Sequence, residues 1–172
     1  KNIYERFLNQ ASVLDGLDFL IIDTGAGIGG NTQHFLEMAD EVIVVTVPDP
    51  AAITDAYATI KTTSKTKENI LMLLNSVKSD GEALRVFENI KKVADVNIKN
   101  NLDLEFIGHL SLSKDISSSI KKRTLFSDEN SKSSDELRAI VSKLLYRLEQ
   151  KVLDDVSSRS FSNFFRRIIE RF

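Results

Sequence analysis

Asp23 carries the acidic side chain whose surroundings most clearly predict chemistry. It ends the apolar run in DFLIIDTGAGIGG (residues 18–30), and the flexible residues Gly25, Ala26 and Gly27 follow almost at once. A carboxylate at the end of a buried strand can hold a Mg²⁺-bound water, and glycines let backbone N–H groups approach a phosphate. Such a loop also changes shape when the phosphate leaves. The sequence contains no G-x-x-x-x-G-K-[ST] phosphate loop, so the pattern predicts one half of a nucleotide site.

Two other interpretations compete for the same segment. Two apolar residues followed by Asp-Thr-Gly-Ala form the active-site signature of aspartic proteases, in which two such aspartates share a proton. A chain of 172 residues would have to dimerise to supply the second aspartate. Those proteases are almost wholly β, whereas helical patterns follow Asp23, so we reject the protease. The other interpretation is a strand end with a glycine-rich turn that binds no ligand.

The elements that would position Asp23 alternate between strands and helices. Continuous apolar runs, typical of strands covered on both faces of a parallel sheet, predict four strands. These are Phe19–Asp23, Val42–Thr46, Ile70–Asn75 and Leu104–Ile107. This alternation predicts an α/β fold with a mostly parallel sheet flanked by helices. The serine-rich stretch from Ser111 to Ser134 is predicted to be a loop with one short helix.

Capping residues mark the expected helices. Asn31 is predicted to cap a helix through Met38, and Asp49-Pro50 is a strong start signal for a helix to about Lys61. Ser79 or Asp80 opens a third helix, whose predicted buried stripe is Leu84, Phe87, Ile90 and Val93. Ser134 is predicted to cap the longest helix. Its apolar residues at helical spacing are Leu137, Ile140, Val141, Leu144, Leu145, Leu148 and Val152.

Composition restricts the class of protein. The net charge of −2 argues against a general nucleic-acid binder, and the absence of cysteine suits a reducing compartment. No apolar run approaches the length of about 18 residues needed for a membrane span, so a cytoplasmic location is expected. Neither His34 nor His109 has a second ligand at metal spacing, and we interpret both as structural or surface residues.

The segment DFLIIDTGAGI, followed by MADEVIVVTVPDPAAITDAYATIK, resembles the MinD/ParA group of deviant P-loop ATPases. It is most similar to the flagellar, FlhG-type branch, in which Thr-Gly-Ala-Gly and Ile-Thr-Asp-Ala-Tyr are typical. The resemblance implies a MinD-like P-loop NTPase fold whose N-terminal phosphate-loop portion is absent here. The chain would then be the C-terminal part of a longer protein, unable to hydrolyse ATP by itself.

The resemblance also implies roles for individual residues. Asp23 matches the catalytic Walker B aspartate that holds Mg²⁺ through water, and Gly25 to Gly27 match the switch loop. Asn75 matches the asparagine that binds the adenine, and Asp115 lies in the loop near the base, although the family's proline is missing there. The helix after the second strand would form part of the ATP-dependent dimer and partner surface. Its candidate residues are Asp49, Thr54, Asp55 and Tyr57.

The end of the chain forms an amphipathic pattern. Residues 1–153 are assigned to the ATPase domain, 154–160 to a polar linker and 161–172 to a helix. The apolar stripe of this helix is Phe161, Phe164, Phe165, Ile168, Ile169 and Phe172. Phenylalanines beside arginines are typical of an interfacial helix on anionic lipid, and MinD-like ATPases have such a membrane-targeting tail. A helix docked on the domain or on a partner is the alternative.

The resemblance implies an intact protein that binds ATP and Mg²⁺, dimerises, associates with the inner face of the cell membrane and regulates flagellar number or placement. Expected partners are a second copy of the chain, flagellar assembly proteins such as the FlhF GTPase, and an anionic membrane surface, without nucleic acid. One alternative is a MinD or ParA sibling in cell division or DNA positioning. Another is a non-enzymatic flagellar interaction module.

Overall fold

The computed structural model describes residues 17–154 apart from 26, 28, 100 and 129, in two units. Residues 17–40 belong to the first unit and Glu41–Asp154 form the second; each is described by itself. The predicted helix at 161–172 and the predicted linker, apart from Asp154, lie outside the described residues.

In the first unit, helix α2 spans Gly30–Met38, and the described residues before it form neither helix nor strand. The predicted strand Phe19–Asp23 is wrong: these residues form no strand, and Ile21 is 90% exposed. A β-strand is stabilised by hydrogen bonds to a neighbouring strand, and no described strand pairs with this segment. The predicted cap at Asn31 is also wrong, because α2 begins one residue earlier, after Gly29.

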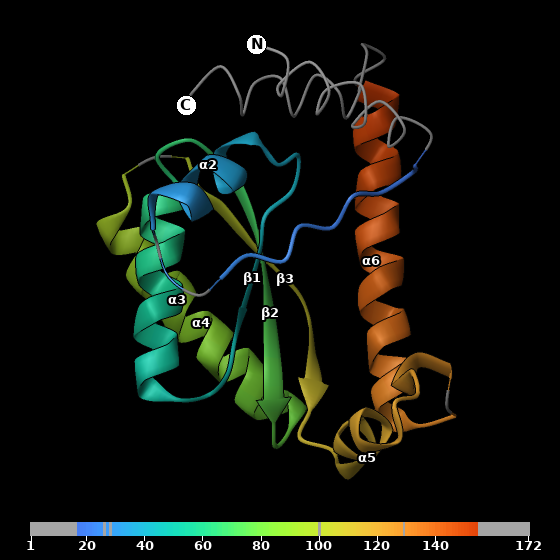
Figure 1. Ribbon diagram of the computed structural model, residues 1–172. Helices are drawn as coiled ribbons and strands as arrows, with labels where there is room; N and C mark the ends of the chain where they lie inside the picture. Colours follow the sequence, from blue (N-terminus) through green and yellow to red (C-terminus); the bar gives the residue numbers. More distant parts are fainter. Residues whose placement is uncertain (1–16, 26, 28, 100, 129, 155–172) are drawn as a thin grey trace. The chain divides into compact units, whose positions relative to one another are not determined.

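The second unit is built on a three-stranded parallel sheet (Figure 1). Its strands are β1 (Ile43–Thr46), β2 (Asn69–Val77) and β3 (Asp103–Ser111), in the spatial order β1-β2-β3. Parallel pairing aligns Val44 with Met72 and Ile70 with Leu104. The predicted α/β fold is confirmed. The three predicted strands of this unit are also confirmed, and β2 and β3 extend beyond the predicted ranges.

Helices cover both faces of the sheet. Helices α3 (Pro50–Thr63) and α4 (Asp80–Asn97) pack on one face, and α6 (Lys132–Asp154) packs against β3 from the other (Figure 1). Between β3 and α6 lie the short helix α5 (Lys114–Lys122) and a 3-10 turn at Phe126–Asp128, so the predicted loop with one short helix is confirmed. Among the described residues, no helix combines the length and apolar character needed to cross a membrane.

The buried stripe of α4 differs from the predicted one. Phe87 and Ile90 are buried as predicted, but Leu84 and Val93 are exposed and the neighbouring Ala83 and Ala94 are buried in their place. The spacing of the buried residues still follows the helical period. The buried face is rotated, with the small side chains of Ala83 and Ala94 before and after Phe87 and Ile90.

The start of α6 also differs from the prediction. Ser134 lies in the first turn of the helix, and Ser131 is the residue that caps it. The Ser134 N–H donates to Ser131 Oγ (3.3 Å), and the Ser131 N–H donates to Ser134 Oγ (3.1 Å). This reciprocal pair is a capping box in which serine replaces the usual glutamate.

Gly108 allows α6 to approach β3. The pairing of β2 with β3 shifts by one residue between Met72 and Leu73, next to Gly108, whose φ is +147°. A Cβ added at Gly108 would lie 2.6 Å from Ile140 Cγ1. Below this contact, Leu71, Ile107 and Ile140 form a buried cluster between the sheet and α6. A glycine is therefore required at this position by both the backbone and the helix above it.

Candidate functional site

The carboxyl ends of the three parallel strands form one edge of the sheet, and α3, α4 and α5 each begin there (Figure 1). Each helix has a side-chain cap. For α4 and α5, Ser79 Oγ accepts from the Glu82 N–H (3.2 Å) and Ser113 Oγ accepts from the Asp115 N–H (3.0 Å). Three helix N-termini place partial positive charge along this edge, which favours an anionic ligand. Ligands of open α/β sheets bind at this edge.

Asp49 has a structural role at the start of α3. Its Oδ1 accepts hydrogen bonds from the N–H groups of Ala51 (2.9 Å) and Ala52 (3.2 Å), which confirms the predicted cap. The hydroxyl of Thr54 donates to the Pro50 carbonyl (2.9 Å), so it too is used within the helix. Asp55 is exposed and Tyr57 is half-buried. A dimer or partner surface on α3 stays a prediction, with Asp55 as its freest acidic side chain.

Asn75 lies within β2, two residues before the strand ends. Its Oδ1 accepts a hydrogen bond from the Ser76 N–H (2.8 Å), and Ser76 has a φ of +57°. The pairing aligns Leu74 with His109 and Val77 with Ser111, so β2 carries one extra residue and forms a bulge here. In this bulge the side-chain oxygen of Asn75 accepts a backbone hydrogen bond. The NH₂ group of Asn75 is therefore the part of the amide that could donate to a ligand.

Asp115 is found on the same edge but not in a loop. It occupies the first turn of α5, its side chain is exposed, and its carbonyl accepts from the Ser119 hydroxyl (3.0 Å). The structure thus places Asn75 and Asp115 at the carboxyl edge of one sheet. Their roles towards a base stay predictions.

Asp23 and the switch loop belong to the first unit. The carboxylate of Asp23 is exposed, and Gly27 has a φ of +98° that suits glycine. Among the described residues, no atom lies within 4 Å of a Cβ built on Gly25 or Gly27, which leaves space beside these two glycines. Ala26 lies outside the described residues. Because the two units are described separately, the meeting of Asp23 with Asn75 and Asp115 stays a prediction.

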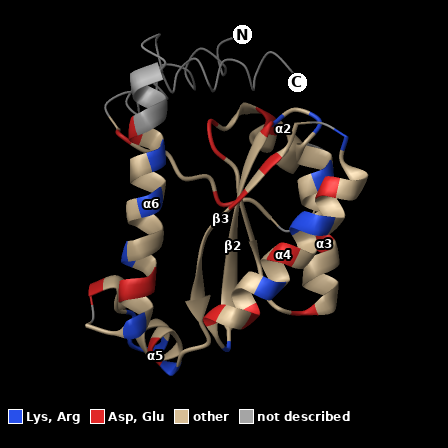
Figure 2. Cartoon of the chain, turned by 180° about the vertical axis from the view of Figure 1, so that it is seen from behind, with Lys and Arg blue, Asp and Glu red and all other residues tan. Residues whose placement is uncertain are grey.

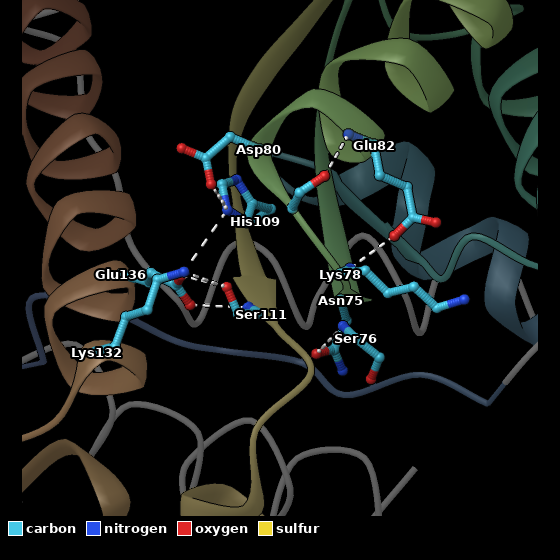
Figure 3. A network of polar contacts seen from close by, with 10 residues as sticks. Asn75, Ser76, Lys78, Asp80, Glu82, His109, Ser111, Lys132 and Glu136 are labelled. Atoms are coloured by element: carbon cyan, nitrogen blue, oxygen red, sulfur yellow. Dashed lines mark hydrogen bonds and ion pairs between the residues drawn. The ribbon is translucent and has the colours of Figure 1, made fainter.

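A polar network that the sequence did not predict ties the end of β3 to α4 and α6 (Figure 3). His109 Nε2 lies 3.3 Å from Asp80 Oδ1 and 3.8 Å from Glu136 Oε1, although neither contact has hydrogen-bond geometry. Ser111 donates to Glu136 through its N–H (2.8 Å) and its hydroxyl (2.5 Å). Lys132 Nζ lies 3.4 Å from the same carboxylate.

This network controls the charge of Glu136. Burial would raise the pKa of its carboxyl, but the hydrogen bonds from Ser111 and the ammonium of Lys132 outweigh burial and hold the pKa below its ordinary value. Glu136 is therefore an ionised group that anchors α6 to β3. Its partner Ser111 is 25 residues away along the chain, and no local signal in the sequence joins the two.

A family model described as ParA, NUBPL iron-transfer P-loop NTPase, matches residues 1–145. The chain belongs to the ParA family of P-loop NTPases. The predicted resemblance to the ParA/MinD group is thereby confirmed. The parallel sheet, with the helices starting at its carboxyl edge, is consistent with part of such an NTPase.

Two relatives of this ParA-family chain carry names connected with flagella or regulation. The flagellum site-determining protein YlxH of Helicobacter pylori is 35% identical over 168 residues, which cover 96% of this chain and 56% of YlxH. The antiactivator FleN of Pseudomonas aeruginosa is 29% identical over 138 residues, covering 78% of this chain and 49% of FleN. The chain therefore spans about half the length of the curated relatives it matches.

The donor set of this ParA-family chain fits Mg²⁺ only together with a nucleotide. Mg²⁺ usually takes one or two protein carboxylates and completes its shell with phosphate oxygens and waters. The single exposed carboxylate of Asp23, followed by glycines with space beside them, suits that arrangement. Within residues 17–154 as described, no cluster of three or more His, Cys, Asp or Glu side chains could hold a metal by itself. When bound, Mg²⁺ would neutralise phosphate charge beside Asp23.

Proposed function

We propose that this chain is part of a MinD-like ATPase that sets the number or placement of flagella. The observation that carries the proposal is the 35% identity to YlxH over 96% of the chain, because that relative is named for determining the flagellum site. The match to FleN supports the same assignment. The YlxH match covers nearly the whole chain and therefore includes the switch segment, the sheet and its carboxyl edge rather than a single motif.

The full-length protein binds ATP and Mg²⁺ in this proposal. Asp23 holds a Mg²⁺-bound water, Gly25 to Gly27 respond to the γ-phosphate, and Asn75 and Asp115 lie beside the base. Three helix N-termini at the sheet edge support an anionic ligand there. The 172 residues contain no phosphate-loop motif, so they should not hydrolyse ATP by themselves.

Nucleotide binding would control a dimer and a membrane contact. Two copies join through the surface around α3, and each carries the predicted amphipathic helix at 161–172. Six large apolar side chains there offer about 1.5–3 kcal/mol each if fully buried, most of it offset by ordering the segment. One copy would bind an anionic membrane weakly, and a dimer would bind far better through effective concentration. The protein would thus be cytoplasmic and peripheral to the membrane, where it meets flagellar assembly proteins such as the FlhF GTPase.

The experiment uses the full-length protein that contains this sequence. Light scattering should show a monomer with ADP and a dimer with ATP and Mg²⁺, and Asp23→Ala should lose the ATP response. Asp18→Ala is the matched control, since Asp18 is an exposed aspartate five residues earlier. Flotation with phosphatidylglycerol vesicles should show ATP-dependent membrane binding that Phe164→Glu/Phe165→Glu abolishes.

Each result can contradict one part of the proposal. A dimer that forms equally with ADP would remove the nucleotide switch. Vesicle binding that survives Phe164→Glu/Phe165→Glu would remove the membrane role of the terminal helix. ATP-dependent dimerisation without any effect on flagella would favour a sibling that positions DNA or the division site.

A further inference from the structure

Helix α5 exposes an apolar side chain and buries a polar one, the reverse of the usual pattern. Ser119 is only 1% exposed, while the next residue, Ile120, is 71% exposed. Ser119 is satisfied, because its hydroxyl donates to the Asp115 carbonyl (3.0 Å). Leu125, just after the helix, is 69% exposed. An exposed apolar patch beside a buried polar residue is informative, because folding alone favours the opposite arrangement.

Three basic residues lie between these two apolar side chains. All six residues from Ile120 to Leu125 are exposed, and we call this segment the docking turn; its basic residues are Lys121, Lys122 and Arg123. In residues 41–154 as described, none of these three has a carboxylate within ion-pair distance. Three basic residues of α6 differ from them, since Lys132, Arg138 and Arg147 each pair with a carboxylate. Lys and Arg colouring is visible on α5 in Figure 2.

The backbone of the docking turn is held in a fixed shape. Arg123 has a φ of +57° and follows the end of α5; its N–H donates to the Ile120 carbonyl (3.2 Å). The Thr124 N–H donates to the Ser119 carbonyl (3.0 Å), which completes a Schellman motif. Glycine is the usual residue at that position, so an arginine there carries a backbone cost.

Helix stability explains only part of this segment. Lys121 and Lys122 in the last turn complement the negative end of the helix dipole. The dipole does not account for two exposed apolar side chains, nor for an arginine in a conformation that favours glycine. These features are accounted for if the turn presents charge and apolar surface together to a binding partner.

We propose that the docking turn binds an acidic segment of a partner protein that also carries apolar side chains. Three exposed cations match carboxylates, and Ile120 and Leu125 on either side match the apolar side chains. The flanking carboxylates of Asp115 and Asp128 are exposed, and a continuous anionic membrane would be repelled by them whereas a short peptide can avoid them. Binding of a nucleic-acid backbone would not bury the two apolar side chains. This proposal does not depend on the proposed function.

The test measures binding of labelled peptides to the full-length protein by fluorescence anisotropy. The acidic–apolar peptide combines Asp and Glu with Leu and Phe. Two control peptides combine Asp and Glu with Ser, and Lys with Leu. Phosphatidylglycerol vesicles and duplex DNA are the competitors. The acidic–apolar peptide should bind best, and salt should weaken it. Ile120→Ser/Leu125→Ser and Lys122→Ser/Arg123→Gly should each weaken it by about tenfold or more.

Matched controls separate binding from folding. Val141→Ser and Lys143→Ser change an exposed apolar and an exposed basic residue of α6, and should leave peptide binding unchanged. Arg123→Gly relieves the positive φ, so it should weaken binding while the melting temperature stays the same or rises. The proposal is wrong if the acidic–apolar peptide binds no better than the others, if neither double variant weakens it, or if vesicles or DNA displace it from the turn.

Discussion

Replacing Gly108 by alanine should strongly destabilise the contact between β3 and α6. The new Cβ would lie 2.6 Å from Ile140 Cγ1 and 3.4 Å from Ile140 Cδ1. Cγ1 sits near the helix backbone, so it cannot move aside as the end of a long side chain would. The backbone also resists the change, because Gly108 has a φ of +147°.

The magnitude follows from two contributions. A residue held in a sparsely populated backbone conformation costs about 1–3 kcal/mol. Inserting a methyl group into a packed contact costs about 1–3 kcal/mol more. Together these predict a loss of about 2–6 kcal/mol in the free energy of unfolding, a large share of the roughly 5–15 kcal/mol that stabilises a domain. The variant should therefore be marginally stable or unfolded.

A double-mutant cycle with Ile140→Ala isolates the steric contribution. Alone, Ile140→Ala should cost about 2–5 kcal/mol through the cavity it leaves beside Leu71 and Ile107. In the double variant the alanine methyl at position 108 occupies part of that cavity. The stability lost in the double variant should therefore be smaller than the sum of the two single losses by about 1–3 kcal/mol. Urea unfolding of the full-length protein, followed by circular dichroism, measures all four species.

Gly81→Ala is the matched control. Gly81 lies in the first turn of α4, and no atom lies within 4 Å of a Cβ built there. Alanine at this position should leave stability unchanged or raise it by about 0.5–1 kcal/mol. Equal effects of the two glycine substitutions, or a cycle that is additive to within about 0.5 kcal/mol, would refute the packing argument.

Three further predictions concern the edge of the sheet. Glu136 has a pKa below its ordinary value, so its ionised form contributes stability that is fully present above the ordinary pKa and is lost as the pH falls through the lowered one. Glu136→Gln should therefore flatten the fall of unfolding free energy as the pH drops below the ordinary glutamate pKa, and an unchanged fall at acid pH would contradict the network. Asp49→Ala should lower the free energy of unfolding by about 0.5–2 kcal/mol, because it removes the α3 cap. In thermal melts, Asp49→Asn should retain most of this stability. Equal losses in the two variants would show that the hydrogen bonds from Ala51 and Ala52 do not contribute to stability. Asn75→Ala should weaken ATP binding by the full-length protein in fluorescence titrations, whereas Ser76→Gly, which relieves the φ of +57°, should keep it; the opposite order would exclude Asn75 from the base site.

Local signals in the sequence predicted the elements that depend on local chemistry. Asp49 followed by Pro50 fixes the start of α3 without help from the rest of the fold, and Ser79 does the same for α4. The apolar run from Ile70 predicted a strand covered on both faces, and the consecutive side chains of Ile70, Leu71 and Met72 are fully buried.

Other features depend on neighbours that a local pattern cannot show. The run Phe19–Asp23 has the composition of a strand, but no described strand pairs with it. The burial of Ala83 and Ala94 in place of Leu84 and Val93 depends on which face of α4 packs on the rest of the unit. The sequence placed Asn75 near the end of its strand, while its hydrogen bond to Ser76 depends on a bulge that exists only when β2 and β3 pair.

The network around Glu136 was missed for the same reason. Its members come from α4, β3 and α6, and are brought together only by the fold (Figure 3). In the sequence, His109 had no partner at metal spacing and was interpreted as structural, and the structure gives it the neighbours Asp80 and Glu136.

The central claim is that this chain is part of a flagellar regulator whose switch depends on Asp23. The most direct measurement is the number and position of flagella, counted by electron microscopy, in cells whose only copy of the full-length protein carries Asp23→Ala. Immunoblots must show equal protein levels, and cells with Asp18→Ala are the control. The account predicts that Asp23→Ala changes flagellar number or placement while Asp18→Ala does not. Wild-type flagella in the Asp23→Ala cells would contradict it.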